Sequence, residues 1–158
     1  MKENLSGELR DKVSLLRGKI RSQGYDLDLY QELSDLLFQY GKISAAINIL
    51  EKSFHQSHEK ANGLADPLNP ALHDARWYFD RGLEFADAFL YEDAIECLQL
   101  ACDQGLDNFE THYCLAGVYK SLEQMSLAEL HCRKSLELNS RFAPAYILLG
   151  SLLKKPGR

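Results

Sequence analysis

The sequence lacks the features of a secreted, membrane-spanning or nucleic-acid-binding protein. Its start, MKENLSGELRDK, has no apolar core, so no signal peptide is expected. The longest apolar run, residues 142–153, is shorter than the ~20 residues that a membrane-spanning helix needs. Lys and Arg number 18 against 23 Asp and Glu, a net charge of −5, whereas a general nucleic-acid binder needs a basic face. These absences predict a soluble, cytoplasmic protein with no nucleic-acid ligand and no membrane insertion.

Motifs that build an active site are also missing. The sequence contains no G-x-x-x-x-G-K, no G-x-S-x-G and no H-E-x-x-H. His55, His58 and His73 imitate part of a zinc set, but no ligand pair has a fixed spacing on two elements, so a solvated helix end is favoured. His131 and Cys132 are neighbours whose side chains diverge by about 100° on a helix. We therefore expect no enzyme activity, no cofactor and no metal site.

The cysteines form no C-x-x-C pair. The sequence has four of them: Cys97, Cys102, Cys114 and Cys132. Free cysteine behaves as a small apolar residue and is often buried. We expect buried thiols in a reducing compartment, with a disulfide or a reactive thiol as the alternative.

What the sequence does contain is a repeat of 34 residues. Windows 75–108, 109–142 and the shortened 143–158 carry similar residue types at equal positions, and window 27–60 follows the same pattern. Position 4 is Tyr30, Tyr78, His112 and Tyr146; position 8 is Ser34, Gly82, Ala116 and Gly150; position 11 is Leu37, Phe85, Tyr119 and Leu153; position 20 is Ala46, Ala94 and Ala128. A period of this length indicates stacked helical pairs, with small residues where two helices cross.

This pattern resembles the tetratricopeptide repeat, a unit of two helices. The resemblance covers residues 27–60 and 75–158. Arg81 stands where that repeat usually has Leu, His112 stands where it has a large aromatic residue, and no Pro closes a unit. The resemblance implies an all-α fold, a right-handed superhelical array of antiparallel helix pairs. It also implies a non-catalytic protein that binds other proteins in a concave groove.

The repeat divides the chain into six predicted segments. They are an N-terminal helix (1–26), repeat 1 (27–60), an insertion (61–74), repeat 2 (75–108), repeat 3 (109–142) and a C-terminal capping helix (143–158). The N-terminal helix has one apolar stripe, formed by Leu5, Leu9, Val13, Leu16 and Ile20. Asn69-Pro70 is a possible helix start, so we expect the insertion to be a short loop followed by an early start of the next helix.

The first helix of each repeat is expected to line the groove through positions 2, 5, 9 and 12. Several of these positions are apolar or cationic where a solvated groove would be polar. The predicted partner-binding residues are Phe38, Phe79, Leu83, Tyr113, Lys120, Ile147 and Lys154. An apolar strip edged by charge is typical of a partner site. The alternative is that the N-terminal helix or the insertion covers this strip.

Two functions follow from the resemblance. The first is an adaptor or scaffold that binds a peptide or helix of another protein. The second is a dedicated chaperone or regulatory subunit for one client, possible as a homodimer because the C-terminal helix is more apolar than one buried face requires. Some tetratricopeptide proteins hold acidic chaperone tails with a clamp of Lys and Asn, which this chain lacks at the matching positions Gln31, Asp35, Phe79 and Leu83.

Overall fold

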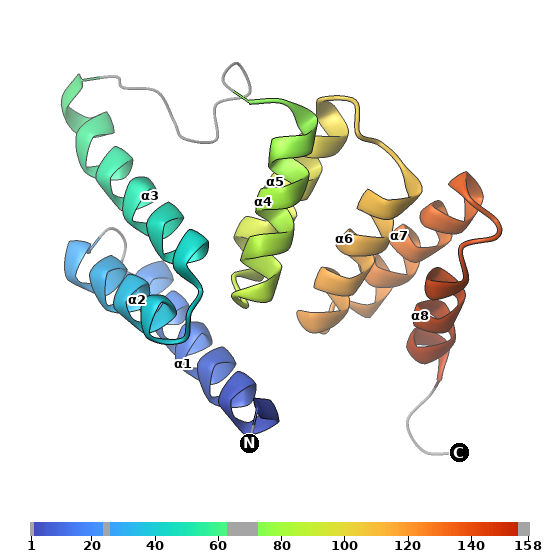
Figure 1. Cartoon of the computed structure of the whole chain (residues 1–158), viewed down its shortest axis with the longest axis horizontal. Helices are drawn as coiled ribbons and strands as arrows, with labels where there is room; N and C mark the ends of the chain where they lie inside the picture. The colour runs from blue at the N-terminus through green and yellow to red at the C-terminus, as the bar shows by residue number, and fades with distance from the viewer. Residues whose placement is uncertain (1, 24–25, 63–72, 155–158) are drawn as a thin grey trace. The chain divides into compact units, whose positions relative to one another are not determined.

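The chain is helical throughout the part that the structure describes. The computed structural model describes residues 2–23, 26–62 and 73–154, and the side chains of residues 7–23, 26–53 and 73–154. These residues form eight α-helices and no strand (Figure 1): α1 (Lys2–Gln23), α2 (Leu27–Gln39), α3 (Ile43–Asn62), α4 (Ala75–Asp87), α5 (Tyr91–Asp103), α6 (Phe109–Ser121), α7 (Met125–Leu138) and α8 (Ala143–Leu153). The all-α prediction is confirmed.

The helices belong to two compact units. Unit 1 comprises Met1–Asn69 and Asp87–Leu90, and it holds α1, α2 and α3. Unit 2 comprises Pro70–Ala86 and Tyr91–Arg158, and it holds most of α4 together with α5 to α8. Over the described residues, no helix is both long and apolar enough to cross a bilayer.

The helix boundaries repeat with the sequence. The first helices α4, α6 and α8 begin at Ala75, Phe109 and Ala143, and the second helices α5 and α7 begin at Tyr91 and Met125. The turns inside the three pairs are equally short and span residues 40–42, 88–90 and 122–124. Such short connections make the two helices of a pair antiparallel neighbours.

The turn inside each pair keeps one backbone conformation. Gly41, Phe89 and Glu123 occupy the same position of the three repeats, and their φ angles are +74°, +62° and +59°. Glycine adopts this left-handed region without steric cost, whereas Phe and Glu do not. The turn geometry therefore persists in repeats 2 and 3 although the glycine of repeat 1 is absent there.

In unit 1 the core forms where α1 and α3 pack on α2. The predicted stripe of α1 is buried at Leu9, Val13, Leu16 and Ile20. Asp26 caps α2, because its side chain accepts a hydrogen bond from the Asp28 amide at 3.0 Å. At the crossing of α2 and α3, buried Ser34 donates to the carbonyl of Ala46 at 3.2 Å. A small residue in each helix thus brings the two backbones close together.

Unit 2 uses the same arrangement twice. A methyl group added at Gly82 of α4 would lie 2.8 Å from Leu98 Cγ and 3.3 Å from the Ala94 carbonyl of α5. In the next pair Ala116 and Ala128 are fully buried. Cys132 of α7 donates to the Ala145 carbonyl of α8 at 3.0 Å. The small residues of positions 8 and 20 therefore mark helix crossings, as the repeat predicts.

The fully buried Ala128 provides a test of this packing. Ala128→Leu should lower the free energy of unfolding by ~1–3 kcal/mol, because extra methylene groups overpack a filled core. Exposed Ser126 lies in the same helix, so Ser126→Leu should leave stability nearly unchanged. Urea unfolding followed by circular dichroism measures both. Equal midpoints for the two variants would contradict the assignment of Ala128 to a crossing.

Two predicted boundaries differ from the structure or lie outside the described residues. α4 begins at Ala75 rather than near Pro70, because Asp74 accepts a hydrogen bond from the Trp77 amide at 2.8 Å and caps the helix there. The rest of the predicted early start, and most of the 61–74 insertion, lie outside the described residues. The predicted segment boundaries therefore remain predictions. The side chains of His55 and His58 also lie outside the described residues.

Candidate functional site

Six of the seven predicted partner-binding residues lie in unit 2, on its three first helices. We call them the unit 2 strip: Phe79 and Leu83 of α4, Tyr113 and Lys120 of α6, and Ile147 and Lys154 at α8. The strip is connected between α6 and α8, because Lys120 Nζ donates to Ser151 Oγ at 2.9 Å. The seventh residue, Phe38, lies on α2 of unit 1.

The strip residues differ widely in accessibility. Ile147 is 75% exposed, and Leu83 is also exposed. Phe79 is only 7% exposed, with the Arg76 guanidinium 5.2 Å from its ring centre. Phe79, Leu83, Tyr113 and Ile147 were all expected at the centre of the strip, but Phe79 is buried and Tyr113 is half-buried. The accessible apolar surface instead lies at Leu83 and Ile147.

Tyr113 belongs partly to the core. Its ring packs edge-to-face on Phe142 at 5.2 Å between ring centres. Tyr113 and Phe142 both pack on the buried cluster of Ala116, Cys132 and Ala145. A substitution of Tyr113 would therefore change the packing of α6 against α7 and α8 as well as the surface of the strip.

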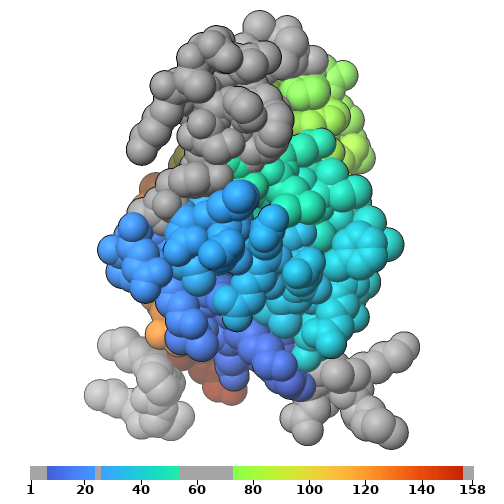
Figure 2. Space-filling view, turned by 90° about the vertical axis from the view of Figure 1, so that its left-hand side faces the viewer, coloured from blue at the N-terminus to red at the C-terminus, as the bar shows by residue number. Residues whose placement is uncertain are grey.

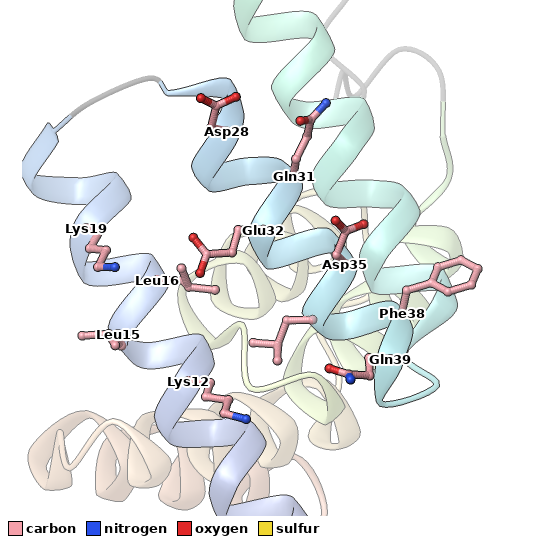
Figure 3. Close-up of a pocket in the computed structure, with 11 residues that line it drawn as sticks. Lys12, Leu15, Leu16, Lys19, Asp28, Gln31, Glu32, Asp35, Phe38 and Gln39 are labelled. Carbon is pink, nitrogen blue, oxygen red and sulfur yellow. The ribbon is translucent and has the colours of Figure 1, made fainter.

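Unit 1 contains an open groove between α1 and α2, with a volume of about 920 Å³. Figure 2 shows the surface that α1, α2 and α3 form on this side of unit 1, and Figure 3 shows the groove. The wall contributed by α2 includes Asp28, Gln31, Asp35 and Phe38, the positions that the repeat predicts to face a groove. Lys12, Leu15, Leu16 and Lys19 of α1 form the opposite wall. Sequence reasoning did not identify α1 as a groove wall.

The two walls of this groove carry opposite charges. Lys12 and Lys19 extend toward α2, while Glu32 extends toward α1 (Figure 3). Lys12 is already engaged, because it donates to Glu8 at 2.6 Å. The Phe38 ring points away from α1 (Figure 3) and is exposed. The groove therefore has a basic wall facing an acidic wall, with an apolar side chain at its edge.

A polar network surrounds buried His112 in unit 2 and was not identified from the sequence. His112 Nε2 lies 2.7 Å from Asp107 Oδ1, and His112 Nδ1 lies 3.0 Å from His131 Nδ1. Because a carboxylate only accepts, His112 donates to Asp107 through Nε2–H, while the direction of the bond between the two histidines depends on their tautomers. Lys134 also donates to Asp107, at 3.3 Å. No sequence signal links these residues, because they come from a loop and two helices.

Cys102 lies beside this network. Its sulfur and one ligand atom each of Asp107 and His112 lie within 4.8 Å of one another. Two ligands on tetrahedral zinc stand about 3.3 Å apart, so the 2.7 Å contact of Asp107 with His112 is a hydrogen bond. Burial, and secondarily the charge of Asp107, raises the pKa of Cys102 to about 11. Cys102 is therefore a protonated thiol near neutral pH, which makes it a poor nucleophile.

The network predicts lower stability in acid. Burial, followed by the charges of His112 and Lys134, lowers the pKa of His131 below its ordinary value. As the pH falls below about 6.5, the unfolded chain binds the proton of this histidine more readily than the folded chain, so the free energy of unfolding falls. His131→Gln should flatten this decline between pH 7.5 and 5. Urea unfolding at several pH values measures it, and an unchanged slope in the variant would contradict the assignment.

Asp107 also contributes to the loss of stability in acid. The hydrogen bond from His112, opposed by burial and assisted by Lys134, lowers the pKa of Asp107. The stabilisation that this carboxylate contributes is present above its unfolded pKa, near 4, and it is lost as the pH falls through the lower folded value.

The search for related proteins gave matches of structure only. No protein-family model matches the sequence, and no curated protein matches it. Among solved structures, MamA superimposes with a TM-score of 0.53 and 17% identity, over 96% of this chain and 80% of MamA. YrrB, described as a TPR protein with an unusual peptide-binding site, gives 0.50 and 22%, over 87% of this chain and 64% of YrrB. A chain of the APC/C hetero-tetramer Cut9–Hcn1 gives 0.52 and 21%, over 98% of this chain and 28% of that one.

Proposed function

Because the chain has the tetratricopeptide-repeat fold, we propose that it is a non-catalytic interaction module that binds a peptide or helix of another protein. The first helices of the repeats supply the binding residues, and the unit 2 strip is the principal contact. In this proposal the protein is a cytoplasmic adaptor or scaffold with protein partners.

One observation carries this proposal. Ile147 of α8, at a position that the repeat predicts to face the groove, is 75% exposed, although a solvated position favours a polar residue. Exposed Leu83 of α4 adds a second apolar side chain to the strip. Apolar surface edged by charge favours a partner site over a purely solvated face.

The charges of the strip favour a ligand with an acidic end. Lys120 and Lys154 are its charged members, and both lie toward the C-terminal ends of their helices. Cations placed this way raise the association rate of an acidic segment more than they raise its affinity. The acidic residues of α2 in unit 1, in contrast, disfavour an acidic ligand. YrrB, whose description includes a peptide-binding site, supports a peptide ligand for the fold.

Affinity capture from a native extract tests the proposed function. The full chain should retain specific proteins, and a segment of a retained protein should then bind the purified chain in a calorimetric titration. Several partners of modest affinity favour an adaptor, whereas one stoichiometric client favours a dedicated chaperone. Binding that depends on neither Ile147 nor Leu83 would contradict the strip as the site.

The second candidate function is a single-client chaperone that acts as a homodimer. It is favoured by the apolar surface of α8, where Tyr146, Ile147 and Leu153 are all exposed. Sedimentation equilibrium measures the oligomeric state. A pure monomer at high micromolar concentration would contradict the homodimeric form of this candidate.

A further inference from the structure

α8 is a first helix that no second helix covers, among the residues that the structure describes. In α2, α4 and α6, the residues at positions 4, 8 and 11 are all buried: Tyr30, Ser34 and Leu37; Tyr78, Gly82 and Phe85; His112, Ala116 and Tyr119. The same positions of α8 are exposed, with Tyr146 at 54% and Leu153 at 52%. Gly150 between them is exposed as well.

Gly82 of α4 and Gly150 of α8 show the difference between a covered and an uncovered first helix. Gly82 is closed over by α5, because an added methyl group would lie 2.8 Å from Leu98 Cγ and 3.0 Å from Leu98 Cδ2. A methyl group added at Gly150, at the same position of its repeat, would meet no atom within 4 Å. The two glycines thus occupy equivalent sites, one filled by a helix and one open.

The second helix that precedes α8, α7, is also more exposed at one position than its counterparts in the other repeats. Position 19 is buried in the second helices of repeats 1 and 2, at Ala45 and Asp93. The equivalent residue of α7, Leu127, is 40% exposed. Both α8 and α7 therefore expose repeat positions that are buried in the preceding repeats.

We propose that Tyr146, Gly150 and Leu153 of α8, together with Leu127 of α7, form a docking face for an amphipathic α-helix of a partner protein. The helix runs antiparallel to α8, as α5 runs antiparallel to α4. It places a small residue beside Gly150 and a leucine four residues later, as Ala94 and Leu98 do beside Gly82. The docking face is distinct from the unit 2 strip, which uses positions 5, 9 and 12, so this proposal does not rest on groove binding.

The repeat itself favours a helix of this kind over a second copy of α8. In each complete pair of this chain, a second helix with a small residue at position 20 covers the first: Ala46 in α3, Ala94 in α5 and Ala128 in α7. An antiparallel pair of α8 helices centred on Gly150 would set glycine against glycine. That arrangement leaves a gap where Leu98 fills the space over Gly82, and unfilled core space is destabilising.

A synthetic peptide of residues 91–108, which contains α5 and the loop that follows it, serves as the probe. A fluorescent form of this peptide should bind the full chain saturably. Gly150→Leu should weaken its binding at least tenfold, because the added side chain fills the place of the docked helix. The same loss is expected for a peptide that carries Ala94→Leu. Gly150→Leu should fold normally, since the new Cβ would meet no atom within 4 Å.

Ile147→Asp is the matched control. It alters the unit 2 strip and leaves the docking face intact, so it should bind the peptide as the wild type does. Failure of groove binding and failure of helix docking are therefore distinguishable. Equal peptide binding by the wild type and by Gly150→Leu would overturn the proposal.

A short free peptide is only marginally helical in water, so we also attach the probe covalently to the chain, which raises its effective concentration. Residues 91–108 appended after Arg158 keep the 34-residue spacing of the repeat. This extension should raise the melting temperature of the wild type but not that of Gly150→Leu. No peptide binding together with no gain from the extension would overturn the proposal. The proposal would also be overturned if the wild type binds no peptide but forms a dimer in sedimentation, and Gly150→Leu abolishes that dimer.

Discussion

Gly82→Leu is expected to lower the free energy of unfolding by ~3 kcal/mol, at the upper end of the usual cost of overpacking a core. The new Cβ alone would lie 2.8 Å from Leu98 Cγ and 3.3 Å from the Ala94 carbonyl. Because these atoms belong to α5, we expect a leucine at this position to push α4 and α5 apart. For a chain of this size, the change lowers the melting temperature by roughly 10 °C.

Gly150→Leu is the matched control, because it makes the same substitution at the same position of another repeat. Its new atoms meet nothing within 4 Å at the Cβ. Removal of glycine from a helix interior stabilises by up to about 1 kcal/mol. The two variants should therefore shift stability in opposite directions, as thermal and urea unfolding would show. Equal losses in both would mean that glycine is needed at position 8 for a reason other than helix crossing.

Ile147→Asp is expected to weaken partner binding by ~2 kcal/mol, about 30-fold, with the fold intact. The side chain is 75% exposed, so the charge enters solvent in the free protein and enters an apolar contact only in the complex. Leu130→Asp is the control, since Leu130 is also exposed but lies on the second helix α7, away from the strip. Quantitative capture from native extract compares the two variants.

Tyr113→Ala gives a less direct test of the same site. It should weaken binding and also reduce stability, because the ring packs on Phe142 and on the cluster around Cys132. Lys154→Glu should slow association and make it more sensitive to salt. Full retention of partners by Ile147→Asp, with loss in Leu130→Asp, would move the binding site to α7.

Much of the fold follows from local sequence signals. The stripe that includes Leu9, Val13 and Leu16 predicted the buried face of α1, and the capping side chain of α2, Asp26, directly precedes that helix. The small residues of positions 8 and 20 predicted the helix crossings. These inferences succeed because helix periodicity and capping depend on residues within one or two turns. The start of α4 was misplaced because Asn69-Pro70 and Asp74 both signal a helix start, and Asp74 makes the capping bond.

The candidate site was less predictable. The repeat positions identified which side chains share a helix face, yet Phe79 is buried and Tyr113 is shared with the core. The Asp107–His112–His131 network had no sequence signal, since its members meet only after α6 and α7 pack together. The contribution of α1 to the unit 1 groove likewise depends on how α1 lies beside α2.

The sequence by itself determined the helical pairs, their 34-residue period and the small residues at each crossing. Each of these is a property of short segments and of their repetition. Only the tertiary structure decided which members of an apolar face remain accessible. Gly82 and Gly150 are identical in type and in repeat position, yet one is covered and the other open. The physical reason is that exposure is set by the helix that packs against a residue, and a sequence position does not specify whether that helix is there.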